Sequence, residues 1–120
     1  MLHLCASCRY FLYRQQTDMR KGFDSLCGLV QNELAKNPLS GDVFVFLNRR
    51  RTHLKLLLWE GDGFSIYYKR LEKGTYELPP LIVGKEGLDI TIKQLMLMLQ
   101  GISMHKIQYR HRYQHQQVIC

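Results

Sequence analysis

The first helical pattern in the chain has apolar residues at the positions i, i+4, i+7, i+8, i+11 and i+15. They lie on one face of a helix, at Met19, Phe23, Leu26, Cys27, Val30 and Leu34. Thr17 or Asp18 is a suitable N-cap for this helix. Asn37-Pro38 is expected to end it, because the residue before a proline is pushed out of the α region.

Other segments have the composition of β-strands. Arg9 to Tyr13 is rich in strand-forming residues, and Val43 to Leu47 is apolar on both faces, as strands inside a covered sheet are. Thr75 to Leu78 is expected to be a short strand that ends at two prolines. Residues 81–83 and 88–90 are candidates for a further hairpin.

A basic hairpin is predicted from His53 to Glu60 and from Phe64 to Arg70, around Gly61-Asp62-Gly63. A three-residue loop with Gly63 in the left-handed region would produce the pairs Lys55–Lys69, Leu57–Tyr67 and Trp59–Ser65. A two-residue loop would mix the lysines with apolar partners on both faces. We therefore expect the three-residue register, which leaves one clean apolar face.

A capping-box pattern, Thr91 with Gln94, opens a second helix. Its apolar residues have helical spacing, and Gly101 lies near its end. The order β-α-β-β-β-(β)-α predicts an α+β fold with a mainly antiparallel sheet of about 4–6 strands and two helices. Residues 1–103 are expected to form a single domain, and residues 104–120, which lack a core pattern, a basic mobile tail.

Composition narrows the class of protein. The 120 residues, 46% of them hydrophobic, suit one globular domain, and no apolar run reaches the roughly 18 residues of a membrane span. No signal peptide is visible, so a soluble cytoplasmic protein is expected. The net charge of +7 is unevenly placed: residues 49–73 contribute +4, residues 104–120 contribute +3, and the rest of the chain is neutral.

Clustered Lys and Arg residues predict a surface that binds a polyanion, with nucleic acid as the main candidate. The candidate DNA-binding residues are Arg49, Arg50, Arg51, Lys55, Lys69, Arg70 and Lys73. In the expected register Lys55 and Lys69 would oppose each other beside Trp59 and Tyr67, on a face suited to a DNA backbone or stacked bases. The alternative is that both lysines extend into solvent while the aromatic residues pack against a helix.

Catalytic and metal-binding patterns are weak. Cys5-x-x-Cys8 and His111-x-x-x-His115 have zinc-like spacing, but they lie at opposite ends of the chain, so we expect free thiols and no metal. There is no defensible Ser-His-Asp order, no glycine-rich phosphate loop and no HExxH motif. We therefore expect neither an enzyme nor a bound cofactor.

The segment from Asp18 to Leu26 resembles the D-M-R-K-G-F-D-G-L signature of a group of bacterial mobile-element proteins, with Ser25 where many members have Gly. Further matching motifs follow in order at 38–41, 43–46, 48–51, 54–55, 59–64 and 69–74. Over about residues 9 to 103 the chain thus resembles the insertion-sequence-sixty-six family accessory protein, often labelled TnpB. The resemblance implies a role in DNA transposition beside a separate, larger transposase that carries the catalytic acids.

The resemblance assigns no molecular activity, so competing hypotheses remain. In the first, the protein is a non-catalytic factor that holds insertion-sequence ends through its basic loop and hairpin. In the second, it is an adapter that docks on the element-encoded transposase through Arg20, Lys21 and Asp24, on the polar side of the first predicted helix. A third, enzymatic hypothesis would require metal-dependent DNA cleavage that depends on Asp18 or Asp42. We expect the first, with no membrane partner.

Overall fold

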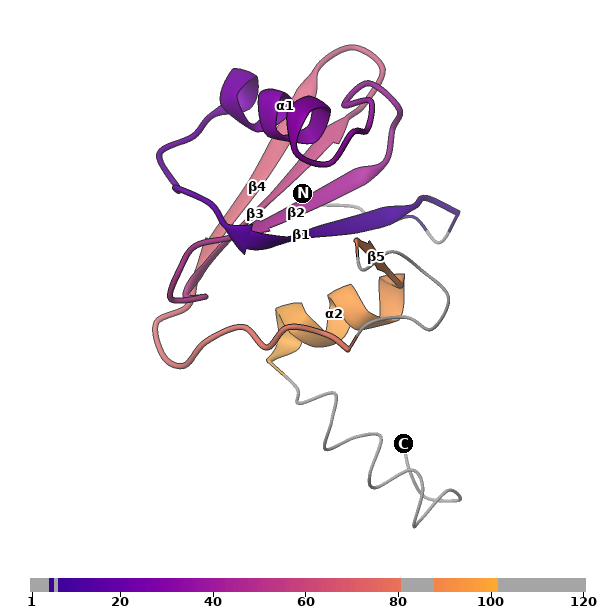
Figure 1. Cartoon of the computed structure of the whole chain (residues 1–120). Helices are drawn as coiled ribbons and strands as arrows, with labels where there is room; N and C mark the ends of the chain where they lie inside the picture. Colours follow the sequence, from indigo (N-terminus) through magenta and orange to yellow (C-terminus); the bar gives the residue numbers. More distant parts are fainter. Residues whose placement is uncertain (1–4, 6, 81–87, 102–120) are drawn as a thin grey trace.

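The computed structural model describes residues 5, 7–80 and 88–101, which form a five-stranded sheet with two helices (Figure 1). The elements are β1 (Tyr10–Gln16), α1 (Phe23–Asn32), β2 (Val43–Leu47), β3 (His53–Trp59), β4 (Phe64–Arg70), β5 (Asp89–Ile90) and α2 (Ile92–Gln100). The strand order is β4-β3-β2-β1-β5, in which β1 and β2 are parallel and the other neighbours antiparallel. The predicted α+β class and element order are confirmed.

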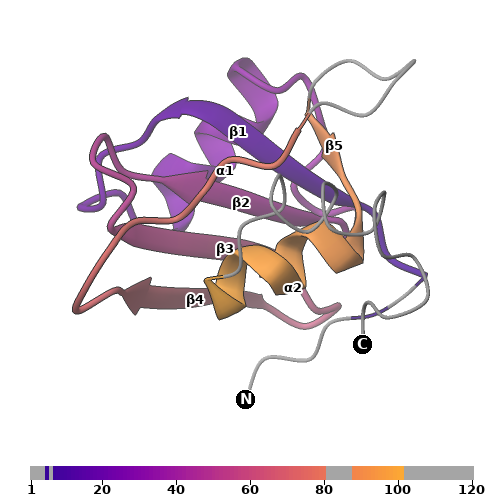
Figure 2. The same ribbon diagram turned by 90° about the horizontal axis from the view of Figure 1, so that it is seen from below.

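One helix covers each face of the sheet, as the two views show (Figures 1 and 2). On one face Leu26 and Val30 of α1 pack against Phe44 and Phe46 of β2. On the other face the side chains of α2 pack against alternate residues of β1, β2 and β3. Every side chain of β2 is therefore buried, as predicted for an interior strand.

The first helix is shorter than predicted. It begins at Phe23, and its N-cap is Gly22, with no side-chain cap. Asp18 instead closes a turn, because its carboxylate accepts a hydrogen bond from the Arg20 N–H and its carbonyl accepts one from the Lys21 N–H. The helix also ends before Asn37-Pro38, at Asn32, close to Ala35, whose φ is +53°.

The hairpin register differs from the predicted one by a single residue. Lys55 pairs with Tyr68, and Lys69 pairs with Leu54. The Glu60 N–H donates to the Gly63 carbonyl at 2.9 Å, so the loop has two residues, and the positive φ belongs to Gly61. The prediction assumed one apolar face, but a helix covers each face of this sheet, and both faces of β3 therefore carry apolar residues. Lys55 and Lys69 consequently lie on opposite faces.

The segment after β4 is not the short strand predicted at 75–78. It crosses the sheet as an extended segment that buries Tyr76, whose N–H donates to the Arg51 carbonyl at 2.7 Å. Burial raises the pKa of Tyr76 to about 12. Of the predicted second hairpin, residues 81–83 lie outside the described residues. The other predicted strand, 88–90, contains β5, which pairs with β1.

The second helix follows its prediction. Thr91 and Gln94 exchange two hydrogen bonds of 3.0 Å as a capping box, and Gly101 ends the helix with a φ of +76°. The predicted basic tail, 104–120, lies outside the described residues. Within the described ranges no helix is long and apolar enough to cross a membrane.

An ion pair joins the beginnings of the two parallel strands. Asp42 is 6% exposed and accepts two hydrogen bonds from the Arg9 guanidinium, at 3.0 and 2.9 Å, and one from the Ser40 hydroxyl at 2.8 Å. We expect Asp42→Ala to lower the free energy of unfolding by about 1–2 kcal/mol, because it removes these bonds while the exposed Arg9 returns to water.

Urea unfolding measures this effect, with Asp62→Ala as the matched control. Asp62 is exposed at the tip of the β3–β4 hairpin and should change the free energy of unfolding by less than about 0.5 kcal/mol. Equal unfolding midpoints for the two variants would contradict the structural role of Asp42.

Candidate nucleic-acid interface

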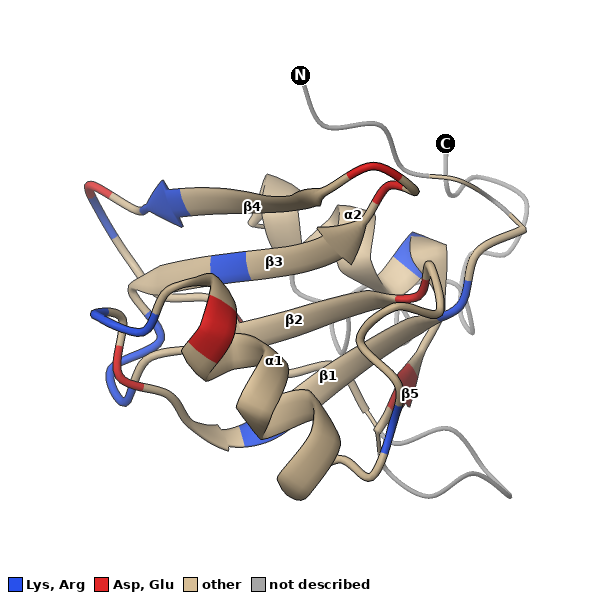
Figure 3. Cartoon of the chain, turned by 90° about the horizontal axis from the view of Figure 1, so that it is seen from above, with Lys and Arg blue, Asp and Glu red and all other residues tan. Residues whose placement is uncertain are grey.

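Two loops meet at one edge of the sheet because β1 and β2 are parallel. Residues 17–22 follow the carboxyl end of β1, and residues 48–52 follow the carboxyl end of β2. Carboxyl ends of adjacent parallel strands form the common place for a binding crevice. Basic residues gather at this end of the sheet, whereas the β3–β4 tip at the opposite end is acidic (Figure 3). The two sets of candidate residues, distant in sequence, therefore belong to one surface.

The arginine loop, Arg49 to Arg51, is shaped by the side chain of Asn48. Its Oδ1 accepts hydrogen bonds from the backbone N–H groups of Thr52 and His53, at 2.9 and 3.0 Å. Its Nδ2 donates to the Thr52 hydroxyl at 3.1 Å and lies 3.2 Å from His53 Nδ1. Arg51 is left-handed, with a φ of +59°, and its N–H donates to the Asn48 carbonyl. One amide side chain thus closes the loop.

Two further hydrogen bonds fix the arginine loop from the other side. The Arg51 and Thr52 carbonyls accept bonds from the N–H groups of Tyr76 and Leu71, at 2.7 and 2.8 Å. All three arginines are exposed. Within the described part of the chain none of their guanidinium groups has a hydrogen bond or an ion pair. The loop therefore presents three uncompensated charges from a fixed backbone.

Lys55 is an internal support and not the exposed partner of Lys69 that the sequence predicts. It is 8% exposed, and its ammonium donates to the Met19 and Lys21 carbonyls, at 2.8 Å each. The same Nζ lies 4.7 Å from the centre of the Tyr68 ring. These contacts hold the first loop, residues 17–22, against β3 and β4. They also occupy the Met19 carbonyl, which would accept a hydrogen bond within the first turn of a helix that began at Asp18.

The other candidate DNA-binding residues of the hairpin are dispersed. Lys69 lies on the α2 face, with its Nζ 3.4 Å from the Leu99 carbonyl. Arg70 is exposed and forms an ion pair with Glu72 at 2.9 Å. Lys73 is exposed in the bend that follows. Of these three, Lys69 lies on the face of the sheet opposite to Lys55.

Of the candidate partner-binding residues, only Asp24 lies in α1, where it is exposed in the first turn. Arg20 and Lys21 precede the helix, so the predicted polar helix face is wrong for them. Arg20 forms an exposed ion pair with Asp18 at 2.7 Å, and its guanidinium holds the pKa of the Asp18 carboxyl at about 2. Asp18 is therefore ionised at any physiological pH.

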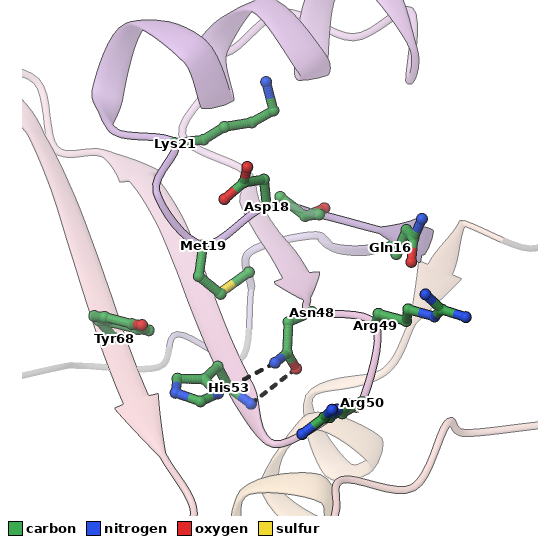
Figure 4. Close-up of a pocket in the computed structure, with 10 residues that line it drawn as sticks. Gln16, Asp18, Met19, Lys21, Asn48, Arg49, Arg50, His53 and Tyr68 are labelled. Carbon is green, nitrogen blue, oxygen red and sulfur yellow. Dashed lines mark hydrogen bonds between the residues drawn. The ribbon is translucent and has the colours of Figure 1, made fainter.

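A pocket of about 620 Å³ lies between the two loops, and we name it the loop pocket (Figure 4). Its lining includes Asp18, Met19 and Lys21 from the first loop, Asn48, Arg49 and Arg50 from the second, and His53 and Tyr68 from β3 and β4. A smaller hollow of about 280 Å³ lies beside it and includes Arg14, Arg49 and Arg51. Sequence reasoning missed Asn48 and Tyr68. A two-residue hairpin loop would have placed Tyr68 beside Lys55 and His53.

The cysteine motif shows no metal site. Among the residues that the structure describes, no three His, Cys, Asp or Glu side chains are grouped to hold an ion. His111 and His115 lie outside those residues. Cys5, Cys8 and Cys27 are free thiols. Hydrogen bonding to Ser7 and Cys8 lowers the pKa of the exposed Cys5 to about 7.

Comparison with known proteins agrees with the sequence motifs. The chain is 38% identical to uncharacterized protein y4hO of Sinorhizobium fredii over 94 residues, which cover 78% of this chain and 80% of that protein. It is 31% identical to uncharacterized protein y4jC of the same organism over 99 residues, 82% of this chain and 83% of that protein. No solved structure matches the chain significantly. Residues 8–109 match the family described as IS66 Orf2-like protein, and the chain belongs to that family, which implies an accessory role in transposition.

Proposed function

We propose that this IS66 Orf2-like protein is a non-catalytic accessory factor that binds the DNA of its insertion sequence through the arginine loop. The observation that supports this function is the set of three exposed guanidinium groups, unpaired within the described residues, on a loop fixed by hydrogen bonds from both sides. Arginine suits this task because its planar donors match phosphate geometry. A loop fixed in advance loses little conformational entropy on binding.

Basic residues next to the arginine loop extend the surface that would contact phosphates. Lys21 lines the loop pocket together with Arg49 and Arg50. Arg20 and Arg70 are held only in exposed ion pairs with Asp18 and Glu72. Exposed pairs contribute at most about 1 kcal/mol, so these arginines exchange carboxylate for phosphate at little cost. The loop arginines, Lys21, Arg20 and Arg70 are six basic residues, so the surface contacts about four to six phosphates.

Salt dependence tests this function. With about four to six phosphates neutralised, the logarithm of the association constant should fall with the logarithm of salt concentration with a slope of about −4 to −5. Fluorescence anisotropy of a labelled insertion-sequence end, measured between about 50 and about 300 mM salt, gives the slope. A slope near zero, or no binding to duplex or single-stranded DNA at low salt, would contradict the proposal.

A second candidate function is an adapter that docks on the element-encoded transposase. It is supported by Phe23, which is 48% exposed at the start of α1 between the charged residues Lys21 and Asp24. Aromatic residues are enriched at the centres of protein–protein interfaces, which polar and charged residues surround. Co-purification with the transposase after nuclease treatment, lost on Phe23→Ala, would favour this function. In either role the protein would act in the cytoplasm, where the element's DNA is located.

A further inference from the structure

The loop pocket is more than a phosphate-binding surface requires. Phosphate groups on a duplex are contacted by exposed side chains and need no cavity. The loop pocket is nevertheless an open depression of about 620 Å³, a volume within the range of about 300–1,000 Å³ found for sites of small molecules. It opens beside the unpaired Arg49 and Arg50. The pocket therefore has room for a group that is attached to a bound phosphate, such as the base of a nucleotide.

One wall of the pocket is aromatic and apolar. Tyr68 is 52% exposed, and its ring centre lies 5.9 Å from that of His53, with 34° between the ring planes. The Met19 side chain enters the space between the first loop and these rings (Figure 4). A large exposed aromatic side chain beside cationic groups is the arrangement on which bases of single strands stack.

The pocket also contains a polar ring atom that can meet a base. Asn48 Nδ2 and the Thr52 hydroxyl lie 3.2 and 2.8 Å from His53 Nδ1. These contacts hold Nδ1 within the protein, so Nε2 is the ring nitrogen left to hydrogen-bond a ligand. Asp18 also lines the pocket, but its carboxylate already accepts four hydrogen bonds from Arg20. His53 Nε2 is therefore the polar atom that can meet the hydrogen-bonding edge of a base.

We propose that the loop pocket binds one unpaired nucleotide of single-stranded DNA, with its phosphate at Arg49 and Arg50 and its base against Tyr68 and His53. This inference rests on the proposed DNA-binding function and specifies its substrate class. A base within a duplex enters a pocket only after it is unpaired and unstacked, which costs free energy, whereas an unpaired base does not bear this cost. The protein therefore prefers single strands, or duplexes with an unpaired overhang, to fully paired DNA of the same sequence.

Anisotropy titrations of the full-length protein test the proposal, with three labelled DNAs of matched sequence: a single strand, its duplex, and the duplex with an unpaired overhang. We expect tighter binding to the first and third. Tyr68→Ala should weaken binding to those two about 10-fold and leave duplex binding and the salt slope unchanged. Tyr68→Phe should restore the affinity, because it retains the ring.

Leu39→Ala is the matched control, because Leu39 is 53% exposed but is not in the pocket lining. It should leave binding to all three DNAs unchanged. A melting curve verifies that each variant folds, and Tyr68→Leu replaces Tyr68→Ala if the latter does not. Equal affinity for duplex and single strand, or an equal loss on both with Tyr68→Ala, would overturn the pocket proposal and leave the proposed function standing.

Two further outcomes separate the possible ligands. Failure of all three DNAs to bind at low salt would overturn the proposed function together with the pocket. Tighter binding of an RNA of the same sequence would overturn the assignment to DNA, because the pocket would then favour a 2′-hydroxyl.

Discussion

Replacing Arg49, Arg50 and Arg51 together by alanine is expected to weaken DNA binding about 100-fold near 0.1 M salt. This estimate takes about 1 kcal/mol for each lost phosphate contact and about 1.4 kcal/mol for each factor of ten in affinity. Because three phosphates would no longer be neutralised, the log–log salt slope should also become less steep by about 3. Anisotropy titrations at several salt concentrations measure both quantities.

Two controls separate charge from position. The corresponding triple lysine variant keeps the charge and should retain most of the salt slope, while losing the bidentate contacts of arginine. Lys93→Ala removes one exposed charge in the first turn of α2, which packs on the face of the sheet opposite to α1. This variant should change the affinity for DNA little. If the alanine variant bound DNA as tightly as the native protein, the arginine loop would not be the interface.

Lys55→Met is expected to lower the free energy of unfolding by about 2–3 kcal/mol, because it removes two charge-assisted hydrogen bonds and leaves the Met19 and Lys21 carbonyls without their donor. Methionine keeps most of the side-chain volume, so the loss measures the bonds rather than a cavity. Affinity for DNA should fall as the first loop loosens. The salt slope should nevertheless stay the same, because the buried ammonium faces no phosphate.

Lys69→Met is the matched control on the neighbouring strand. Its ammonium has one long contact of 3.4 Å, to the Leu99 carbonyl, so the expected loss of stability is below about 1 kcal/mol. Urea unfolding measures both variants. A salt slope that fell by about 1 in Lys55→Met would mean that this lysine contacts DNA after all.

The sequence predicts the elements of this fold better than their limits and register. Val43 to Leu47, the capping box at Thr91 and the C-terminal Gly101 are confirmed because local chemistry determines them. The start of α1 could not be predicted, since it depends on hydrogen bonds from Lys55, more than thirty residues away in the chain. The hairpin register was wrong because a helix covers each face of the sheet, which local alternation does not reveal.

The candidate site was predictable in composition and not in arrangement. Charge clustering identified Arg49 to Arg51, whose exposure the structure shows. Lys21 lines one pocket with Arg49 and Arg50 because β1 and β2 are parallel, which no local pattern indicates. Tyr68 was missed because the one-residue error in register moved it away from Lys55.

The hydrogen bonds that Tyr76 and Leu71 donate to the arginine loop have a consequence for transferring it to other proteins. A peptide from Asn48 to His53 would keep every charge of the loop but none of these donors, and its backbone would leave the left-handed geometry of Arg51. Grafted onto another scaffold, it would bind DNA as an unstructured basic peptide does. The smallest part of the protein that could be transferred with this loop geometry is therefore the intact sheet together with the segment that follows β4.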